Sequence, residues 1–343
     1  MEILSDSEKD IKKAADAISR GLLVAFPTET VYGLGADVFN QEALARVFEA
    51  KNRPRFDPLI VHIADQSFIN KIGDLSLLSS EAKANLSILI KELWPGPLTL
   101  ILPKRKEVPA LATAGLENVA VRFPLSKTAQ KLIQLSKTGA IAAPSANPFG
   151  KLSPTRAEHV IEGLGEKVDF IIDGGKTSVG IESTVLDLTS SPITILRHGG
   201  TSREAIEALI GQVEVNSSPS PDTEEKTQAL ISQALLSPGQ LKSHYAPSAL
   251  LYLYKPGELA LIPDNPNEGR LYFSGDKESG DRDSSSRIKV LSKSGKLTEA
   301  AANLFDKLHE LDSLGLKIIR AEEAPYSGLG EAINDRLRRA AAR

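Results

Sequence analysis

Short apolar segments that end at a proline recur along the first part of this chain. Examples are LLVAFP at 22–27, LTLILP at 98–103 and VAVRFP at 119–124. Each has the length of a buried strand and is too short for a stable helix. Segments with apolar residues at helical spacing lie between them, for example at 7–20, 41–53 and 79–96. Because strands and helices mix without strict alternation, the sequence predicts an α/β fold whose sheet has mixed strand directions.

The composition changes after Gly211, which indicates a second folding unit. Residues 213–247 are rich in Ser, Pro and charge and lack sustained periodicity, so we interpret them as a linker. Strand-like and helix-like segments then alternate to the C-terminus, a pattern typical of a small Rossmann-like domain. The 343 residues suit two domains of roughly 150 residues each. We expect a first domain at 1–212, a linker at 213–247 and a C-terminal domain at 248–343.

The composition also excludes several classes of function. The chain has no cysteine, so disulfides, thiolate metal sites and a cysteine nucleophile are excluded. Its net charge is −3, and a site for a polyanion must therefore be a local cluster of cations. The N-terminus lacks a secretory apolar region, and no apolar run approaches the ~18 residues that span a bilayer. We expect a cytoplasmic protein without a membrane partner.

The stretch KNRPRFDPLIVH at 51–62 places three cations, Lys51, Arg53 and Arg55, within five residues. Two prolines restrict this backbone, and at ~4 Å and an effective dielectric near 20 each pair of like charges costs on the order of 4 kcal/mol. A cluster of this kind is often a solvated surface. Holding the three charges in order becomes favourable when an anion is present, so the stretch indicates an anion site.

Further polar residues stand where the predicted strands end, which is where ligands of α/β sheets bind. They are Thr28, Thr30, Tyr32, His62, Arg122, Ser145, Asn147, Ser153, Glu182, Ser183, Thr184 and Arg197. Taken alone, His62 is more often a core histidine, and PSAN at 144–147 is compatible with a simple turn. The GGKT at 174–177 is no phosphate-binding loop of the Walker type, because Phe170 stands where the first glycine is needed. A nucleotide would therefore bind without such a loop.

Seven motifs in fixed order connect these residues to a known family. They are FPTETVYGLGA, KNRPRFDPLIVH, WPGPLTLIL, VAVRFP, APSAN with SPT, IDGG with GIESTV, and ILRHG. Together they closely resemble the threonylcarbamoyl-AMP synthase family, whose catalytic module is the YrdC-like domain. SPGQLKSHYAP at 237–247 and the separate C-terminal domain resemble the long, two-domain form of that family.

The resemblance implies a fold, a reaction and partners. The fold is a twisted mixed sheet around a basic concave cavity, with the catalytic domain at 1–212. The activity is that of a nucleotidyltransferase that joins L-threonine, bicarbonate (or CO2) and ATP into threonylcarbamoyl-AMP and releases pyrophosphate. The product feeds threonylcarbamoyladenosine formation beside the anticodon of tRNA through downstream transfer machinery. Positioning and electrostatics would dominate such chemistry.

The resemblance also assigns residues to roles. Lys51 and Arg53 would be the catalytic phosphate ligands, with Arg55 and Asp57 at the edge of the nucleotide site. The threonine site would comprise Thr30, His62, Arg122, Ser145 and Ser183, with Arg122 on the carboxylate. The remaining ATP-binding residues would be Asn118, Ala143, Ser145, Asn147, Ser153, Arg197 and Tyr245, with Tyr245 as a lid. The protein would supply no dedicated metal site, and Mg²⁺ would bind mainly through the ATP phosphates.

This chain departs from the family pattern in three places. Ser126-Lys127 replaces a His-Pro pair, His198 replaces the proline of LRPG, and the linker motif has Gln240 where the family has methionine. The linker change bears on how Tyr245 closes the site. None of the three removes a proposed ligand.

Two other functions are compatible with parts of this sequence. One is a non-enzymatic module that binds double-stranded RNA, which the net charge of −3 disfavours. Another is the carbamoyl-adenylate chemistry of hydrogenase-maturation carbamoyltransferases, whose zinc fingers this cysteine-free chain cannot build. The basic segment AINDRLRRAAAR at 332–343 could contact tRNA, a partner or its own sheet. We expect the last, since Ile333 and Leu337 share a helical face.

Overall fold

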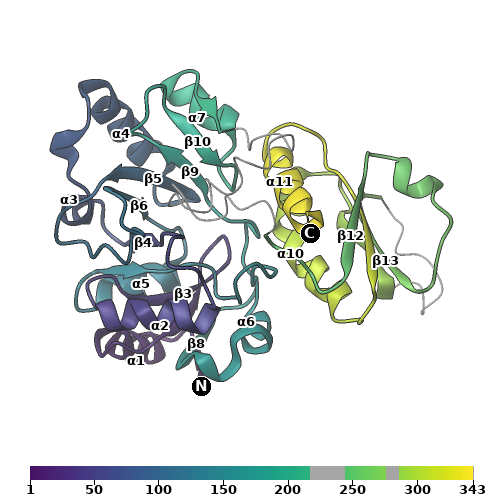
Figure 1. The fold of residues 1–343 in the computed structure, drawn as a ribbon, viewed down its shortest axis with the longest axis horizontal. Coiled ribbons are helices and arrows are strands. Elements are labelled where there is room, and N and C mark those ends of the chain that lie inside the picture. Colours follow the sequence, from purple (N-terminus) through teal and green to yellow (C-terminus); the bar gives the residue numbers. More distant parts are fainter. Residues whose placement is uncertain (217–243, 276–285, 343) are drawn as a thin grey trace.

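The computed structural model describes residues 1–216, 244–275 and 286–342. Within them the chain forms two sheets that belong to two domains, joined through residues that lie largely outside the described ranges (Figure 1). The first sheet has 11 strands and ends with Val215, a few residues beyond the boundary predicted at 212. The second has four strands and begins at Leu250.

The large sheet has the mixed direction that the sequence predicts. Its order is β1-β8-β2-β3-β7-β4-β6-β5-β9-β10-β11. Strand β4 pairs parallel with β6 and antiparallel with β7, so both strand directions occur at the centre of the sheet. The strands are β1 (Glu2–Ser5), β2 (Val24–Pro27), β3 (Tyr32–Asp37), β4 (Ile60–Ile63), β5 (Leu98–Pro103), β6 (Asn118–Arg122), β7 (Ala140–Ala142), β8 (Phe170–Asp173), β9 (Thr184–Asp187), β10 (Thr194–Arg197) and β11 (Glu214–Val215).

Helices cover both faces of this sheet. They are α1 (Glu8–Ser19), α2 (Gln41–Lys51), α3 (Ile69–Ile72), α4 (Ser80–Leu93), α5 (Lys127–Leu135), α6 (Ala157–Leu164) and α7 (Arg203–Ile210). Helices α1 and α5 pack on one face with Phe26 and Ile141, and α2 and α4 pack on the other with Leu34 and Val61. Most begin at a Ser or Asn whose side chain accepts a hydrogen bond from the backbone N–H three residues on, for example Ser7 and Asn40. Each such cap stabilises its helix by about 1 kcal/mol.

The segment TETVYGLGAD at 28–37, with its two glycines, predicts a loop, and the structure corrects this expectation because Tyr32–Asp37 form strand β3. The glycines instead pack closely against neighbouring side chains. A Cβ on Gly35 would lie 2.8 Å from the Phe26 ring and 3.0 Å from Ile141, so only glycine lets β3 lie against both neighbours. Strand β1 and helix α5 are two further elements that the sequence pattern did not predict, and both are short, with four and nine residues.

The C-terminal domain is a small parallel α/β unit. Its sheet has the order β12-β15-β13-β14, and all its pairs are parallel. The strands are β12 (Leu250–Tyr254), β13 (Glu268–Ser274), β14 (Ile288–Ser292) and β15 (Ile318–Glu322), and the helices are α10 (Leu297–Asp312) and α11 (Leu329–Ala341). Both helices lie between this sheet and the large domain (Figure 1).

The two domains contact each other through polar and close-packed side chains. Asp306 of α10 forms ion pairs with Arg156 and Lys176 of the large domain, both at 2.7 Å. His309 of α10 stacks on His159 of α6 with a centroid distance of 3.8 Å. The helices therefore dock directly on the first domain. No helix in the described part of the chain is long and apolar enough to cross a membrane.

Candidate active site

One cavity collects most of the residues that the sequence assigns to ligand binding. Nine of those residues line it: Thr30, Arg53, His62, Arg122, Ala143, Ser145, Ser183, Arg197 and Tyr245. They come from the ends of β4, β6, β7 and β10 and from the loops beside them. The cavity measures about 50 Å³, far less than the roughly 300 Å³ at which pockets for small organic ligands begin. A ligand as large as a nucleotide could enter only after part of the wall moves.

The end of helix α2 sets the position of the cationic loop. Asn52 takes a left-handed conformation, with φ 51°, and so ends the helix between Lys51 and Arg53. Arg53 turns inward, where its Nη2 donates to the Pro58 carbonyl at 2.9 Å and forms an ion pair with Asp57 at 2.8 Å. Arg55 is exposed. The three cations of this loop therefore separate into two buried side chains and one in solvent.

Lys51 is held behind the cavity wall. Its Nζ donates to the Ser145 carbonyl at 2.5 Å and to the Asn147 carbonyl, and the residue is 1% exposed. Burial, and then the nearby Arg53, hold the pKa of Lys51 well below its usual value. In this conformation Lys51 supports the Ser145–Asn147 loop, and its contact with phosphate stays a prediction.

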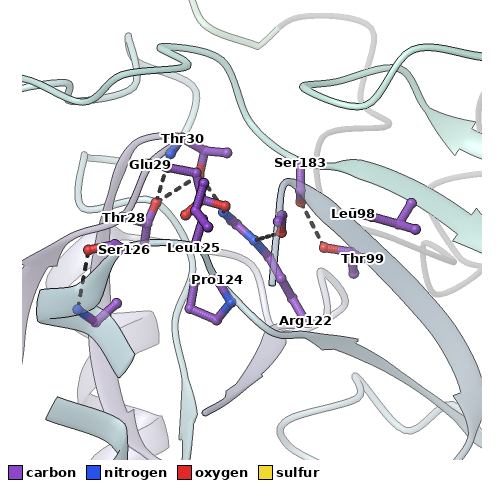
Figure 2. A network of polar contacts seen from close by, with 12 residues as sticks. Thr28, Glu29, Thr30, Leu98, Thr99, Arg122, Pro124, Leu125, Ser126 and Ser183 are labelled. Atoms are coloured by element: carbon purple, nitrogen blue, oxygen red, sulfur yellow. Dashed lines mark hydrogen bonds and ion pairs between the residues drawn. The ribbon is translucent and has the colours of Figure 1, made fainter. Parts of the chain in front are cut away.

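Arg122 stands at the centre of a buried polar network (Figure 2). Its Nη1 donates to Thr30 Oγ1 at 2.9 Å, its Nη2 to Glu29 at 2.6 Å and its Nε to the Gly96 carbonyl at 3.4 Å. A guanidinium has five N–H donors, so two remain, one on each terminal nitrogen. Those two suit a carboxylate, which Arg binds in a bidentate manner.

His62 and Thr99 flank Arg122 on the same face of the sheet. The register places His62 and Thr99 opposite Arg122 on the neighbouring strands β4 and β5. The Thr99 hydroxyl lies 2.7 Å from the Ser183 hydroxyl, as Figure 2 shows. Burial, and then the charge of Arg122, lower the pKa of His62 to about 3. His62 is therefore neutral near pH 7 and can form a hydrogen bond without adding a charge.

Arg197 and Glu182 form the opposite wall. Arg197 donates to the Ser183 carbonyl through Nε at 3.1 Å and Nη2 at 2.9 Å, which ties the end of β10 to the start of β9. Glu182 accepts a 2.5 Å hydrogen bond from the Ser153 hydroxyl. A Cβ on Gly199 would lie 2.3–2.4 Å from backbone atoms of residues 182–184, so the chain here can pack this closely only with glycine.

His244 and Tyr245 cover the cavity from the end of the linker. Both are buried, and the backbone N–H of Ala246, the next residue, donates to the Gly150 carbonyl at 2.8 Å. Tyr245 has a left-handed φ of 62°, a strained conformation for a tyrosine. Its side chain packs in a hydrophobic cluster that joins residues of the large domain to the core of the C-terminal domain, and it also lines the cavity. The rest of the linker motif lies outside the described residues.

Several predicted site residues do not line this cavity. Asn147, Ser153 and Asp57 lie directly behind its wall, in contact with Lys51, Glu182 and Arg53 respectively. Asn118 is farther away, at the first residue of β6, where its side chain donates to Thr189 at 3.0 Å. Arg122 ends the same strand, so the structure does not bring Asn118 to the cavity that Arg122 lines.

Two charged residues in contact with this site, Glu29 and Arg336, were not predicted from the sequence. Glu29 lies inside the FPTETVYGLGA motif, between the candidate residues Thr28 and Thr30, and this place is the sequence signal for its pairing with Arg122. Its Oε2 is buried without a hydrogen-bond partner among the described residues. Arg336, which bonds Glu182 from the C-terminal domain, has no sequence signal that would link it to the site.

The buried histidines predict a loss of stability in mild acid. His62 is 3% exposed and His244 6%, and burial as the first cause lowers the pKa of each to about 3. Because both titrate near 6.5 when unfolded, the unfolded chain binds more protons below that pH. Stability then falls as pH decreases from about 6.5 toward 3, by up to about 1.4 kcal/mol per pH unit for each histidine.

Urea unfolding at pH 7.5 and at pH 5.5 measures this effect. We expect a lower midpoint at pH 5.5 for the natural chain, and a smaller difference for a His244→Gln variant. Equal midpoints for the natural chain at both values would contradict the burial of these two rings in the neutral form.

The fold and the cavity together define a class of protein. A mixed α/β sheet carries a recess into which buried arginines project, so the class is an α/β protein that binds small anionic ligands. Comparisons with known proteins narrow this class. A family model described as "Telomere recombination" matches residues 16–199, and a model of the C-terminal domain of threonylcarbamoyl-AMP synthase matches residues 201–342.

Curated relatives are similar in sequence to this chain over nearly its full length. The threonylcarbamoyl-AMP synthase of Pyrococcus abyssi is 42% identical over 97% of this chain and 94% of its own. That of Bacillus subtilis is 40% identical over 98% of this chain and 94% of its own. The crystal structure of P. abyssi Sua5 with L-threonine is similar with a TM-score of 0.84 and 39% identity, and the match covers 99% of this chain and 98% of that one. This chain belongs to the threonylcarbamoyl-AMP synthase family.

Proposed function

We propose that this chain joins L-threonine, bicarbonate (or CO2) and ATP into threonylcarbamoyl-AMP and pyrophosphate. The observation that carries this proposal is the convergence of three buried arginines, Arg53, Arg122 and Arg197, on one cavity. Three fixed cations can hold the carboxylate of an amino acid and the phosphates of a nucleotide close together. Membership in the threonylcarbamoyl-AMP synthase family supports the identity of both ligands.

The reaction needs two bond-forming steps. The threonine amine first attacks the carbon of CO2 and loses a proton, which gives a carbamate. A carbamate oxygen then attacks the α-phosphorus of ATP, and the bond from that phosphorus to the bridging oxygen of pyrophosphate breaks. The protein contributes by holding the two anions in line and by stabilising charge on the phosphates.

The threonine half of the site is proposed around Arg122. Its two remaining donors would hold the carboxylate, with Thr30 and Ser183 beside it. The neutral His62 would offer a hydrogen bond to the hydroxyl or amine of threonine without repelling Arg122. Ser145, which pairs with Gly33 at the cavity wall, would contact both substrates.

The nucleotide half is proposed between Arg53 and Arg197, with Lys51 behind them and Ala143, Asn147 and Ser153 toward the adenosine. Among the described residues, no cluster of three or more His, Asp or Glu side chains could hold a metal. The carboxylate at the wall, that of Glu182, is already bonded by Ser153 and Arg336. These residues fit Mg²⁺ held through ATP phosphates and water, where it would neutralise phosphate charge.

Entry of the substrates would require Tyr245 to move. With Tyr245 and His244 in place, the cavity of about 50 Å³ cannot hold ATP. The left-handed backbone of Tyr245 stores strain that opening would release. We propose that the end of the linker opens for binding and closes over the bound substrates, which excludes water from the reactive intermediate.

The product is expected to supply a transfer reaction on tRNA, and an enzyme that uses ATP for this purpose is expected in the cytoplasm. Pyrophosphate release tests the synthase activity itself. The purified chain is incubated with ATP, Mg²⁺ and bicarbonate, with and without L-threonine. We expect release that depends on threonine and is weak with alanine, which lacks the hydroxyl.

Release that is independent of threonine would contradict the proposal. Tight binding of double-stranded RNA without threonine-dependent release would favour the RNA-binding alternative in its place.

A further inference from the structure

Arg336 of the C-terminal domain ends inside the wall of the active site of the large domain. It stands in helix α11, and its side chain has no solvent exposure. Nε donates to Glu182 Oε2 at 2.8 Å, Nη2 to the His198 carbonyl at 2.8 Å, and Nη1 to Asp335 at 2.7 Å. The last helix therefore does more than contact its own sheet, which corrects the expectation from the sequence.

The two acceptors in the large domain are neighbours of proposed ligands. Glu182 directly precedes Ser183, and His198 directly follows Arg197. Arg197 is itself bonded to the Ser183 carbonyl, so Arg336 adds a second connection between the same two segments. The positions of both segments therefore depend on a side chain from the other domain.

The contact between Arg336 and Glu182 also affects the charge at the cavity wall. Glu182 is the acidic side chain among the described residues that line the cavity. A bare carboxylate there would repel a triphosphate. Burial alone would raise the pKa of Glu182, but Arg336, Arg197 and the Ser153 hydroxyl outweigh burial and lower it. Glu182 is thus ionised, and Arg336 is its direct counter-ion.

The same helix also contacts the cover of the cavity. The guanidinium carbon of Arg336 lies 5.1 Å from the centre of the Tyr245 ring, within the range of a cation–π interaction. The backbone N–H of His244 donates to the Arg339 carbonyl at 3.2 Å. Helix α11 therefore holds the wall and the cover of the cavity together.

We propose that Arg336 is a positioning residue for ATP, through which the C-terminal domain completes the nucleotide half of the active site. It holds Glu182 away from the phosphates and neutralises its charge, so that the cavity keeps a positive potential. This inference rests on the proposed function, because it assigns a role within that reaction.

The test compares four variants of the full-length chain. Arg336→Met removes the charge, and Arg336→Lys keeps it. Arg338→Met is the matched control, since Arg338 is on the same helix, is half-exposed and pairs with Glu323 of its own domain. Arg336→Met with Glu182→Gln removes both charges at once, so no buried ion is left unpaired and the chain should fold even if the single variant does not.

We expect Arg336→Met to lower kcat/KM for ATP on the order of 100-fold, mainly through KM, as removal of one partner of a buried pair does. The KM for threonine should change far less. Arg336→Lys and the added Glu182→Gln should each recover at least about tenfold of the loss, because lysine keeps a counter-ion for Glu182 and glutamine removes the charge of the carboxylate. Arg338→Met should match the natural chain.

ATP binding measured by calorimetry on the same four proteins separates this inference from the proposed function. If the natural chain releases no pyrophosphate with threonine, the proposed function fails, and ATP affinity still reports on Arg336. Equal ATP affinity and equal KM for Arg336→Met and Arg338→Met would overturn the inference. So would a loss in Arg336→Met that Glu182→Gln leaves unchanged, since a purely structural role predicts that result.

Discussion

Arg53→Met, combined with Asp57→Asn, is expected to reduce threonylcarbamoyl-AMP synthesis by at least about a thousandfold, the scale of losing a fixed electrostatic donor and a phosphate clamp. Arg53 lines the cavity, is 7% exposed, and its Nη1 has no hydrogen-bond partner among the described residues. That nitrogen is therefore available to a phosphate. The measurement is the rate of pyrophosphate release at saturating threonine.

Asp57→Asn is combined with Arg53→Met in one variant because Arg53 and Asp57 form a buried ion pair. Removing Arg53 alone leaves a buried carboxylate and costs about 3–5 kcal/mol of stability, which would confuse inactivity with unfolding. Arg55→Met is the control, since Arg55 lies in the same loop but is exposed. A rate near that of Arg55→Met would contradict a phosphate-binding role for Arg53.

Arg122→Met, combined with Glu29→Gln, is expected to raise the KM for threonine by at least about a hundredfold, because it removes a bidentate, charge-assisted contact. Arg122 and Glu29 form a buried ion pair at 2.6 Å, so both are changed together. The KM for ATP in the same variant is the internal control and should change little. Steady-state kinetics with each substrate varied in turn gives both values.

Arg122→Lys tests whether the planar shape of the guanidinium group, and not only its charge, is needed for threonine binding. Lysine keeps the charge but lacks the planar fork, so we expect it to recover only a small part of the affinity for threonine. If the double variant raised the KM for ATP as much as that for threonine, Arg122 would serve the nucleotide and our assignment of the two halves of the site would be wrong.

The sequence predicted the parts of the fold that depend on local pattern. Mixed sheet direction followed from the order of strands and helices, and strands β2, β5 and β6 lie where apolar runs end at a proline. The segment that forms strand β3 was predicted to be a loop, because its two glycines, Gly33 and Gly35, are typical of a flexible backbone. Gly35 lets β3 pack against Phe26 and Ile141, and Gly33 lies against Ala143 and Phe26, contacts that no local pattern can reveal.

The candidate site likewise combines residues that the sequence predicted with contacts that it could not predict. Strand ends indicated Arg122 and His62, and the structure places them side by side on β4 and β6. Lys51, Arg53 and Arg55 look equivalent in the sequence, yet Lys51 and Arg53 are buried and Arg55 is exposed. This difference depends on tertiary partners, such as the Pro58 carbonyl that Arg53 contacts, which the sequence does not reveal. Arg336 was beyond prediction, since its contact with Glu182 joins residues 154 positions apart in two domains.

The central claim is that this cavity makes a threonylcarbamoyl adenylate, and the mass of the product tests it most directly. The natural chain is incubated with ATP, Mg²⁺, L-threonine and ¹³C-bicarbonate. The nucleotides are then separated, and their masses are measured by mass spectrometry. We predict an AMP adduct that contains threonine and one ¹³C atom and forms together with pyrophosphate. An adenylate that carries threonine without the labelled carbon, or no adduct at all, would contradict the account.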